Sequence, residues 1–227
     1  MAIYCISDLH GQFTLFKKML DKINFSSEDT LYVLGDVVDR GKDGIECLQY
    51  ILNHPQMQMI LGNHEKMMID VLYSKTNLPR SIRSWNRNGN GPTIDGLIQL
   101  SDEEQLDLLT KVSKLPLYKE LSVQGKSYYL VHGSPYSVKE EDFVQVDRRD
   151  YRDYFVWERF NKDQQFFPDK IVIAGHTPTS YLQDITPLTI WHGNNIIDID
   201  CGCAMLGDGG RCGCLCLDTL EEFYVDE

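Results

Sequence analysis

The sequence contains no run of apolar residues long enough to cross a membrane as a helix, which takes about 20 residues. Its longest apolar stretches have the length of a strand and end in polar residues. The first residues, MAIYCISDLHG, hold neither a basic segment nor the apolar run of a secretory signal. We therefore expect a cytoplasmic protein with no membrane partner.

Positive charge is scarce, since 22 Lys and Arg residues stand against 34 Asp and Glu residues, for a formal net charge of −12. This excess of negative charge repels a phosphate backbone at long range, which argues against stable binding of nucleic acid. Recognition of a phosphate group must therefore depend on a few local cations. Internal repeats, low-complexity tracts and linkers are also absent from the sequence, and its 227 residues fit a single domain.

Seven cysteines, an odd number without a secretory signal, favour reduced thiols over a disulfide framework. Five of them lie near the C-terminus, at positions Cys201, Cys203, Cys212, Cys214 and Cys216. Their C-x-C spacing places the thiols on one face of a strand, whereas structural zinc sites favour two-residue gaps and tight turns. We expect these thiols to be buried and to pack as small apolar side chains.

Three apolar runs, at residues 2–6, 30–34 and 57–61, have the composition of strands. Between them, residues 12–22 and 44–52 carry apolar side chains at helical spacing. Strands that alternate with helices predict βαβ units and a parallel sheet. The sequence therefore indicates the α/β fold class.

The middle of the chain has a different pattern. Residues 74–96 are rich in basic residues, Gly and Pro without a clear apolar period, and we interpret them as an insertion over the site. Ser101 and Glu104 have the spacing of a capping box, which predicts the start of a helix. Residues 117–133 predict a hairpin, and residues 147–160 predict a helix.

The last third of the chain predicts further strands. The segment at residues 170–179 predicts a strand that ends at His176. Residues 194–203 and 209–218 predict two strands that pair with each other.

Polar clusters follow the predicted strands, at residues 8–11 (DLHG), 35–41 (GDVVDRG) and 62–65 (GNHE), and two later strands end in His132 and His176. In open α/β sheets, ligands bind at the carboxyl ends of the strands, so we expect these side chains to converge. Carboxylates and imidazoles together with an amide oxygen suit Mn²⁺, Fe or Zn²⁺ better than Ca²⁺. The pattern predicts a site for transition-metal ions.

In their order and spacing these motifs resemble the metallophosphoesterase superfamily, specifically the phosphoprotein phosphatase branch with its small bacterial and phage members. The resemblance extends from residue 3 to about residue 217. It implies a β-sandwich of mixed sheets flanked by helices and built from βαβ units. It also implies one calcineurin-like domain over residues 1–227, with residues 74–96 as a probable cap insertion.

The resemblance also implies two divalent ions, most simply Mn²⁺, with Fe or Zn²⁺ as alternatives. Carried over position by position, it gives the first ion the ligands Asp8, His10 and Asp36. It gives the second ion Asp36, Asn63, His132 and His176, so that Asp36 bridges the two. A hydroxide between the ions would be the nucleophile.

Four further residues match catalytic positions of the family. His64 matches the general acid that protonates the leaving alkoxide, and Asp39 matches the carboxylate that orients it. Arg40 and Arg159 match the guanidinium groups that bind phosphoryl oxygens. Ser7 stands where the protein phosphatases usually have Gly, which weakens only the assignment to a protein substrate.

The sequence favours one function and leaves two alternatives. The favoured function is hydrolysis of phosphate monoesters by a monomeric Ser/Thr protein phosphatase, whose partner is a phosphorylated protein or a small phosphate ester. The second is a symmetrical bis(5'-nucleosyl)-tetraphosphatase, that is, a diadenosine tetraphosphate hydrolase. In that case Trp85, Arg83, Arg87 and Asn88 could hold a base and a polyphosphate, although Trp85 could equally pack against the domain. The third is a silent phosphate-binding regulatory module, against which the complete ligand set argues.

Overall fold

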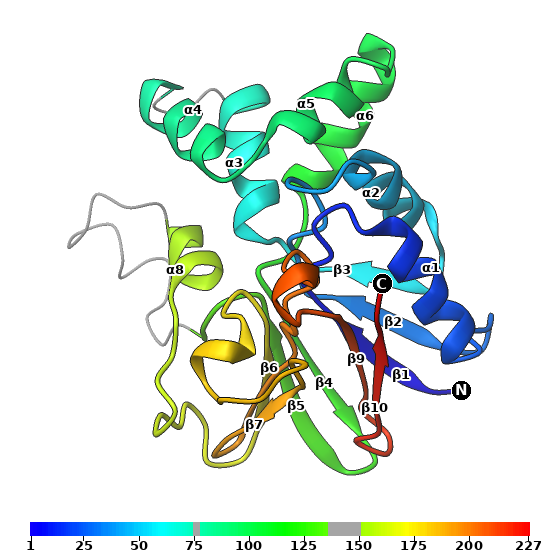
Figure 1. Ribbon diagram of the computed structural model, residues 1–227, viewed down its shortest axis with the longest axis vertical. Coiled ribbons are helices and arrows are strands. Elements are labelled where there is room, and N and C mark those ends of the chain that lie inside the picture. Colours follow the sequence, from blue (N-terminus) through cyan, green and yellow to red (C-terminus); the bar gives the residue numbers. More distant parts are fainter. Residues whose placement is uncertain (75–77, 136–150) are drawn as a thin grey trace.

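Two five-stranded sheets form the centre of the protein (Figure 1). The structure, a computed structural model, describes residues 1–74, 78–135 and 151–227. Sheet A contains, in spatial order, β10 (Glu222–Val225), β9 (Cys212–Cys216), β1 (Ile3–Ile6), β2 (Thr30–Val33) and β3 (Met57–Met59). Sheet B contains β4 (Tyr118–Val123), β5 (Lys126–Val131), β6 (Ile171–Ala174), β8 (Ile196–Asp198) and β7 (Trp191–His192). Both sheets are mixed and helices flank them, as predicted.

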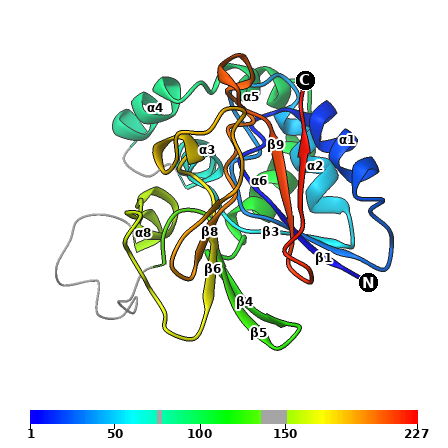
Figure 2. The same ribbon diagram turned by 60° about the horizontal axis from the view of Figure 1, so that its bottom comes forward.

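The predicted βαβ units are present in sheet A. Strands β1, β2 and β3 are parallel, and helices α1 (Phe13–Lys22) and α2 (Gly44–Asn53) connect them. Figure 2 shows both helices on one side of the molecule, opposite α8 (Tyr151–Trp157). Strands β9 and β10 extend the sheet in antiparallel orientation. Because β1, β2 and β3 run in the same direction, their carboxyl ends lie at one edge of the sheet.

In sheet B, β4 and β5 form the predicted hairpin, with both turn residues, Gln124 and Gly125, at positive φ. Strands β5, β6 and β8 are parallel, so sheet B also has an edge at which carboxyl ends gather. The predicted pairing of residues 194–203 with residues 209–218 is wrong. Strand β8 pairs with β6 and β7, whereas β9 pairs with β1 and β10. Both segments have the apolar pattern of interior strands, which predicts a strand but does not specify its partner.

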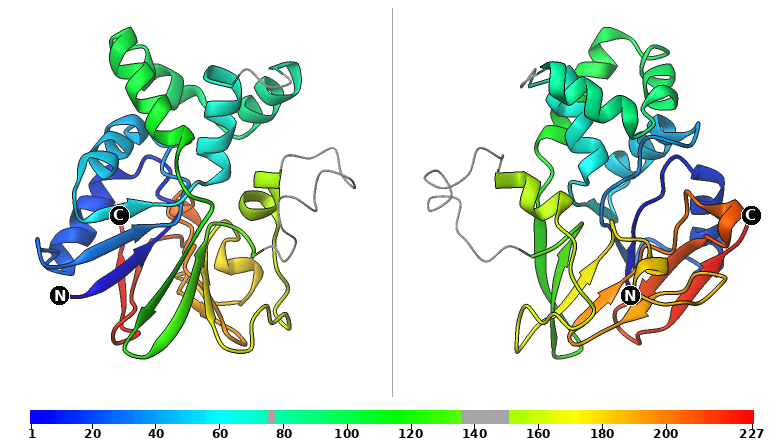
Figure 3. Two further views of the ribbon diagram at one scale, coloured as in Figure 1. Left: turned by 180° about the vertical axis from the view of Figure 1, so that it is seen from behind. Right: turned by 60° about the vertical axis from the view of Figure 1, so that its left-hand side comes forward.

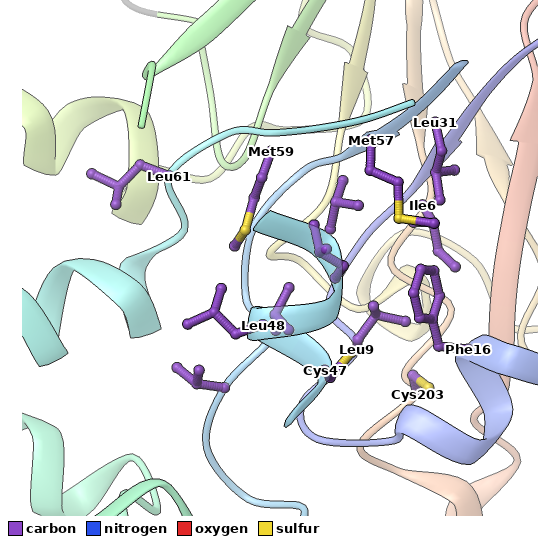
Figure 4. Close-up of a cluster of buried hydrophobic side chains, with 14 of the residues drawn as sticks. Ile6, Leu9, Phe16, Leu31, Cys47, Leu48, Met57, Met59, Leu61 and Cys203 are labelled. Carbon is purple, nitrogen blue, oxygen red and sulfur yellow. The ribbon is translucent and has the colours of Figure 1, made fainter. Parts of the chain in front are cut away.

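Alternation of side chains along the strands produces two cores. One face of each sheet turns toward the other sheet, and buried residues such as Cys5 and Tyr32 of sheet A lie with Leu130 and Ile173 of sheet B. The opposite face of sheet A packs against the helices. Figure 4 shows part of this second cluster, which includes Ile6 and Leu31 from the sheet, Phe16 from α1 and Leu48 from α2.

Helices gather at one end of the molecule, next to the carboxyl ends of the sheet A strands (Figures 1 and 3). They are α3 (Asn63–Leu72), α4 (Leu78–Arg87), α5 (Gly91–Leu97) and α6 (Asp102–Ser113). The predicted capping box begins α6, because the Ser101 hydroxyl accepts a hydrogen bond from the Glu104 N–H and the Glu104 carboxylate accepts one from the Ser101 N–H. No helix in the described ranges is long and apolar enough to span a membrane.

Helices α4 and α5 occupy most of residues 78–96, within the segment interpreted as an insertion, although the sequence shows no clear apolar period there. Leu78, Ile82 and Trp85 have helical spacing in α4, but Trp85 alone of this helix is buried and polar residues make up most of the rest. The helix predicted at residues 147–160 is present as α8 over Tyr151–Trp157, while residues 147–150 lie outside the described part of the chain.

Candidate dinuclear metal site

A cavity of about 240 Å³ opens where the carboxyl ends of strands from both sheets meet. Sheet A contributes Asp8 and His10 after β1, Asp36 after β2 and Asn63 after β3. Sheet B contributes His176 to the lining, shortly after β6, and places His132, directly after β5, fully buried beside Asp36. All six predicted metal ligands are at most 8% exposed. The structure therefore brings together side chains that lie up to 168 residues apart in the sequence.

Asp36 lies at the centre of this group. Its Oδ2 atom is 3.8 Å from His10 Nε2, and its Oδ1 atom is 3.3 Å from His132 Nε2. Two clusters of ligand atoms within 4.8 Å of one another share this carboxylate, one with His10 and His64, the other with His132 and His176. A carboxylate shared between two clusters has the arrangement of a ligand that bridges two ions.

Two predicted ligands lie beside these clusters. Asn63 Oδ1 is 2.9 Å from His132 Nε2. Asp8 lines the same cavity, and its Oδ2 accepts hydrogen bonds from the Ser7 hydroxyl and, at 2.9 Å, from the His176 N–H. Ser7, the residue that departs from the family pattern, therefore contacts a predicted ligand directly.

Backbone carbonyls orient the imidazole rings. His10 Nδ1 lies 3.1 Å from the carbonyl oxygen of Val38, and His132 Nδ1 lies 2.6 Å from that of Leu34. In both rings Nε2 remains to face Asp36. His176 has the reverse orientation, because its Nε2 is 3.2 Å from the carbonyl oxygen of Trp157 and its Nδ1 is left for a ligand role. Such carbonyl contacts fix the tautomer and the aim of a metal-binding histidine.

The electrostatics of the cavity favour bound cations. Burial lowers the pKa of His10 and of His176 to about 3, so both imidazoles are neutral and available as ligands. Burial alone would also lower the pKa of His132, but the Asp36 and Asp8 carboxylates outweigh it and raise this pKa to about 10. Burial opposes ionisation of Asp36 as well, yet the surrounding imidazoles hold its pKa well below the usual value. The buried carboxylates therefore attract positive charge to this point, which divalent cations would supply.

Backbone strain is concentrated at the same place. Among the described residues, ten that are not glycine have a positive φ, which costs free energy for a residue with a side chain. Six of them are predicted site residues: Asp8, His10, Asp36, Asp39, Arg40 and His176. Strain of this kind persists where the surrounding structure enforces it, and it is typical of functional sites.

Steric contacts require glycine at position 62, the first residue of the GNHE motif. A Cβ atom on Gly62 would lie 2.3 Å from Asp36 Oδ1 and 2.4 Å from the Asp36 backbone nitrogen. Only glycine allows the end of β3 to come this close to the shared carboxylate. From here α3 begins, and the His64 N–H in its first turn donates to Asp36 Oδ1 at 3.0 Å.

His64 and Asp39 form a buried pair at the side of the cavity. His64 Nδ1 lies 2.6 Å from Asp39 Oδ2, so that Nε2 faces the cavity, 3.3 Å from Arg40 Nη2. Burial opposes a charge on His64, but the Asp36 and Asp39 carboxylates outweigh it and raise the pKa of this imidazole. A raised pKa keeps a proton on the ring, which a general acid requires.

Arg159 approaches the cavity from another direction. It follows α8 and lines the cavity together with Trp157 and Tyr181. Its guanidinium lies over the Tyr181 ring, 5.5 Å from the centroid. Both predicted phosphate-binding arginines therefore reach the same cavity, Arg40 from the end of β2 and Arg159 from beyond α8.

Three buried acids, Glu65, Asp198 and Asp200, have no role assigned from the sequence. Glu65 is fully buried, and its carboxylate accepts hydrogen bonds from the N–H groups of Asp36, Val37 and Val38 at 2.8 to 3.2 Å. It therefore holds the loop that carries Asp36. Asp200 lines the cavity just beyond the end of β8, where burial and the neighbouring Asp8 raise its pKa. Because Asp200 lies inside the segment 194–203 that was predicted as a strand, no motif at a strand end marked it.

Residues 78–96 lie against the site, but they offer no stacked aromatic ring of the kind that would hold a nucleobase. Trp85 is 1% exposed and is absent from the cavity lining, so stacking of Trp85 on a nucleobase is contradicted. Arg83 and Arg87 are exposed and also lie outside the lining. Asn88 does line the cavity, and its side chain donates to the carbonyl oxygen of Ser84 at 2.8 Å.

The cysteines have the predicted state, since all seven are free and buried. No group of potential metal ligands within the described ranges includes a cysteine. The C-x-C segment therefore contributes packing to the core.

Comparison with known sequences identifies relatives with named activities. The family model described as calcineurin-like phosphoesterase matches residues 1–202. Serine/threonine-protein phosphatase 2 of Salmonella typhimurium (strain LT2) is 31% identical over 131 residues, which are 57% of each chain. The protein of the same name from Escherichia coli (strain K12) is 28% identical over 203 residues, which cover 78% of this chain and 88% of that protein.

A second group of relatives bears a different name. The symmetrical bis(5'-nucleosyl)-tetraphosphatase of Paracidovorax citrulli is 30% identical over 134 residues, 58% of this chain but 44% of that protein. The chain thus spans about half the length of the first relatives that it matches.

Solved structures agree with the fold. One described as a diadenosine tetraphosphatase has a TM-score of 0.65 at 18% identity, covering 98% of this chain and 92% of that one. A protein serine/threonine phosphatase from Saccharomyces cerevisiae has a TM-score of 0.64 at 14% identity, covering 100% of this chain and 80% of that one. At these identities the likeness concerns the fold alone, whereas the family match over residues 1–202 includes every motif at the carboxyl ends of the strands. The chain belongs to the calcineurin-like phosphoesterase family.

Proposed function

We propose that this protein is a phosphoesterase with two divalent metal ions that hydrolyses phosphate monoesters, and that its substrates are phosphorylated serine and threonine residues of proteins. The observation that carries the proposal is the shared carboxylate of Asp36 between two clusters of imidazoles. His64 Nε2 lies 3.8 Å from this carboxylate, and Arg40 Nη2 lies 3.3 Å from His64 Nε2. Nucleophile activation, proton donation and phosphate binding would thus meet in one cavity.

The ligand set fits two ions of the Mn²⁺ type. Asp8, His10 and Asp36 would hold one, and Asp36, Asn63, His132 and His176 would hold the other. When bound, divalent cations supply Lewis acidity and an activated water at neutral pH. Mixed oxygen and nitrogen donors suit Mn²⁺, Fe and Zn²⁺, and among these we propose Mn²⁺.

The remaining residues supply proton transfer and charge. His64 would donate a proton from Nε2 to the leaving alkoxide, and Asp39 would hold the ring in the tautomer that this step requires. Arg40 and Arg159 would bind the non-bridging phosphoryl oxygens, where their fork of N–H donors matches the developing charge. Since Arg40 Nη2 is 3.3 Å from His64 Nε2, the phosphoryl group and the leaving oxygen would be held next to each other.

Three observations favour a phosphoprotein over a dinucleoside polyphosphate. The match to the Escherichia coli phosphatase extends over 88% of that protein, whereas the match to the Paracidovorax citrulli tetraphosphatase covers 44% of its length. Trp85, the aromatic residue of the cap that could have stacked on a base, is buried. The net charge of −12 also opposes a polyanionic ligand. The third alternative, a silent binding module, would not need a complete set of ligands, acid and orienting carboxylate.

Parallel turnover assays on a phosphoserine peptide and on diadenosine tetraphosphate, with added Mn²⁺, test the substrate class. We expect the higher kcat/KM on the peptide. A higher kcat/KM on the dinucleotide would assign the protein to the second class, and turnover of neither substrate would favour the silent module.

Two further properties belong to the proposal. Seven free thiols suit the reducing cytoplasm, where disulfides are rare. We also propose that the protein acts as a monomer. Cell fractionation and size-exclusion chromatography test these two properties.

A further inference from the structure

We propose that Trp85 and Thr93 are positioning residues for the general acid, and that helices α4 and α5 act on His64 through Asp39. The inference rests on the proposed phosphoesterase function and assigns a role to the segment that otherwise resembles a cap. Neither residue lines the cavity, so their effect would pass through the carboxylate between them and His64.

The Asp39 carboxylate is enclosed by donors on both of its oxygens. Trp85 Nε1 donates to Oδ1 at 3.1 Å and to Oδ2 at 2.9 Å. The Thr93 hydroxyl donates to Oδ1 at 2.5 Å, and His64 Nδ1 approaches Oδ2 at 2.6 Å. Asp39 is also tied at its backbone, because its N–H donates to Thr93 Oγ1 at 2.8 Å. Each oxygen therefore has two partners, and the carboxylate plane is fixed.

A fully buried carboxylate needs hydrogen-bond partners, because burial removes it from water. Asp39 has no exposed surface, so water cannot stabilise its charge. Hydrogen bonds to a charged acceptor are worth roughly 1.5–3 kcal/mol each, and removal of one leaves part of a buried charge unsatisfied. Without the donors from α4 and α5, Asp39 would be held by His64 alone and could turn with it. The orientation of His64 Nε2 toward the leaving oxygen would then be lost.

The same segment also supports the backbone of the dyad. The Arg40 N–H donates to the carbonyl oxygen of Gly89 at 3.0 Å, between α4 and α5. Asp39 and Arg40 both have φ close to 70°, a conformation that neighbouring structure must enforce. Residues 78–97 thus hold the main chain and the side chain of Asp39 at once.

Simple packing is the competing explanation for Trp85. A buried tryptophan requires one acceptor for its N–H, and any buried carbonyl would serve. Here the N–H instead reaches both oxygens of the carboxylate that orients the predicted acid. The two explanations differ in a measurable way, since a packing role affects every reaction of the enzyme equally, whereas a positioning role affects only reactions that need the proton.

Kinetics on two leaving groups test the inference. Trp85→Phe keeps most of the ring and removes the N–H, and Thr93→Val removes the hydroxyl at nearly constant size. We expect each variant to lower kcat by about tenfold on a phosphoserine peptide, a part of the 10² to 10⁴ that general acid catalysis supplies. On p-nitrophenyl phosphate, whose leaving group needs little protonation, the loss should be less than about twofold. Metal content should stay at the wild-type value.

Matched variants separate positioning from folding. Thr93→Ser keeps the hydroxyl and should restore most of the activity lost in Thr93→Val. Trp191→Phe makes the same change in β7, away from the cavity lining, and should leave both substrates unaffected. In a His64→Asn background, Trp85→Phe should add no further loss on the peptide, because residues that act through one group are not additive.

Equal losses on both substrates, or full additivity with His64→Asn, would overturn the positioning role while leaving the phosphoesterase function in place. A wild-type protein that hydrolyses neither substrate with Mn²⁺ would overturn the proposed function and this inference together.

Discussion

Sheet A and sheet B contribute to the candidate site in different ways. Sheet A supplies compact motifs, in which a predicted ligand and a predicted catalytic residue are neighbours, as in Asn63 and His64. Sheet B supplies single histidines, His132 and His176, at the ends of two strands. The first of the two ligand clusters comes from sheet A alone, whereas the second joins Asp36 to both histidines of sheet B. One half of the site is thus formed within a single sheet, by motifs that follow one another along the chain. The other half forms only when sheet B packs against sheet A.

Contacts between the sheets show how the second half is held. His132 of sheet B places Nδ1 2.6 Å from the carbonyl oxygen of Leu34, which follows β2 of sheet A. The His176 N–H donates to Asp8 of sheet A. Beneath these contacts lies the apolar core between the two sheets. We infer that packing in this core holds the two histidines of sheet B beside Asp36.

Removing the residue that both halves share should have the largest effect. Asp36→Asn keeps the size of the side chain but removes the charge at the centre of both clusters. We expect the loss of both ions and a fall in kcat of at least about a thousandfold, since bound metal ions are worth several kcal/mol in the transition state. Elemental analysis and turnover of a phosphoserine peptide measure the two effects. His132→Asn, which affects only the sheet B cluster, is the matched variant and should retain more metal.

Removing the predicted acid of sheet A should leave both halves of the metal site intact. His64→Asn should lower kcat on the peptide by about a hundredfold or more, with a smaller loss on p-nitrophenyl phosphate. The metal content should remain unchanged. Metal loss equal to that of Asp36→Asn would instead make His64 a ligand, in agreement with its place in the first cluster.

Weakening the core between the sheets tests the packing claim. Leu130 is fully buried there, and Leu130→Ala should lower the free energy of unfolding by about 2–5 kcal/mol. Because the sheet B cluster depends on this packing, the affinity for the second ion should fall more than that for the first. Denaturant unfolding measures the stability, and metal titration measures the two affinities. An equal fall in affinity for both ions would contradict the claim that packing between the sheets holds the sheet B cluster in particular.

We expect the smallest effect on activity from a substitution outside both halves of the metal site. Ser101→Ala removes the capping box of α6 and should cost about 1 kcal/mol of stability. It should leave kcat and metal content at the wild-type values. A clear loss of activity in this variant would mean that the helical end is coupled to the site through more than the Asp39 contacts.

Much of sheet A was predictable because local pattern determines it. Apolar runs alternate with amphipathic helices, and each run ends in a polar motif, as at Asp8 and Asp36. The pairing of β8 and β9 was not predictable in the same way, since both strands have the pattern of buried strands and their partners depend on how the chain crosses between sheets. The contact of Trp85 with Asp39 joins residues 46 positions apart, and no local pattern encodes such a distance. Asp200 lay inside the segment 194–203 that was predicted as a strand, whereas β8 ends at Asp198, and this strand was also placed in the wrong pair.

Metal content measured together with activity tests the central claim most directly. Protein stripped of metal with a chelator should be inactive on the phosphoserine peptide, and stepwise addition of Mn²⁺ should restore activity as two ions bind per chain. Asp36→Asn should bind neither ion tightly and stay inactive under the same titration. Full activity in the metal-free protein, or saturation of activity at one ion per chain with no further binding, would contradict a dinuclear site shared between the two sheets.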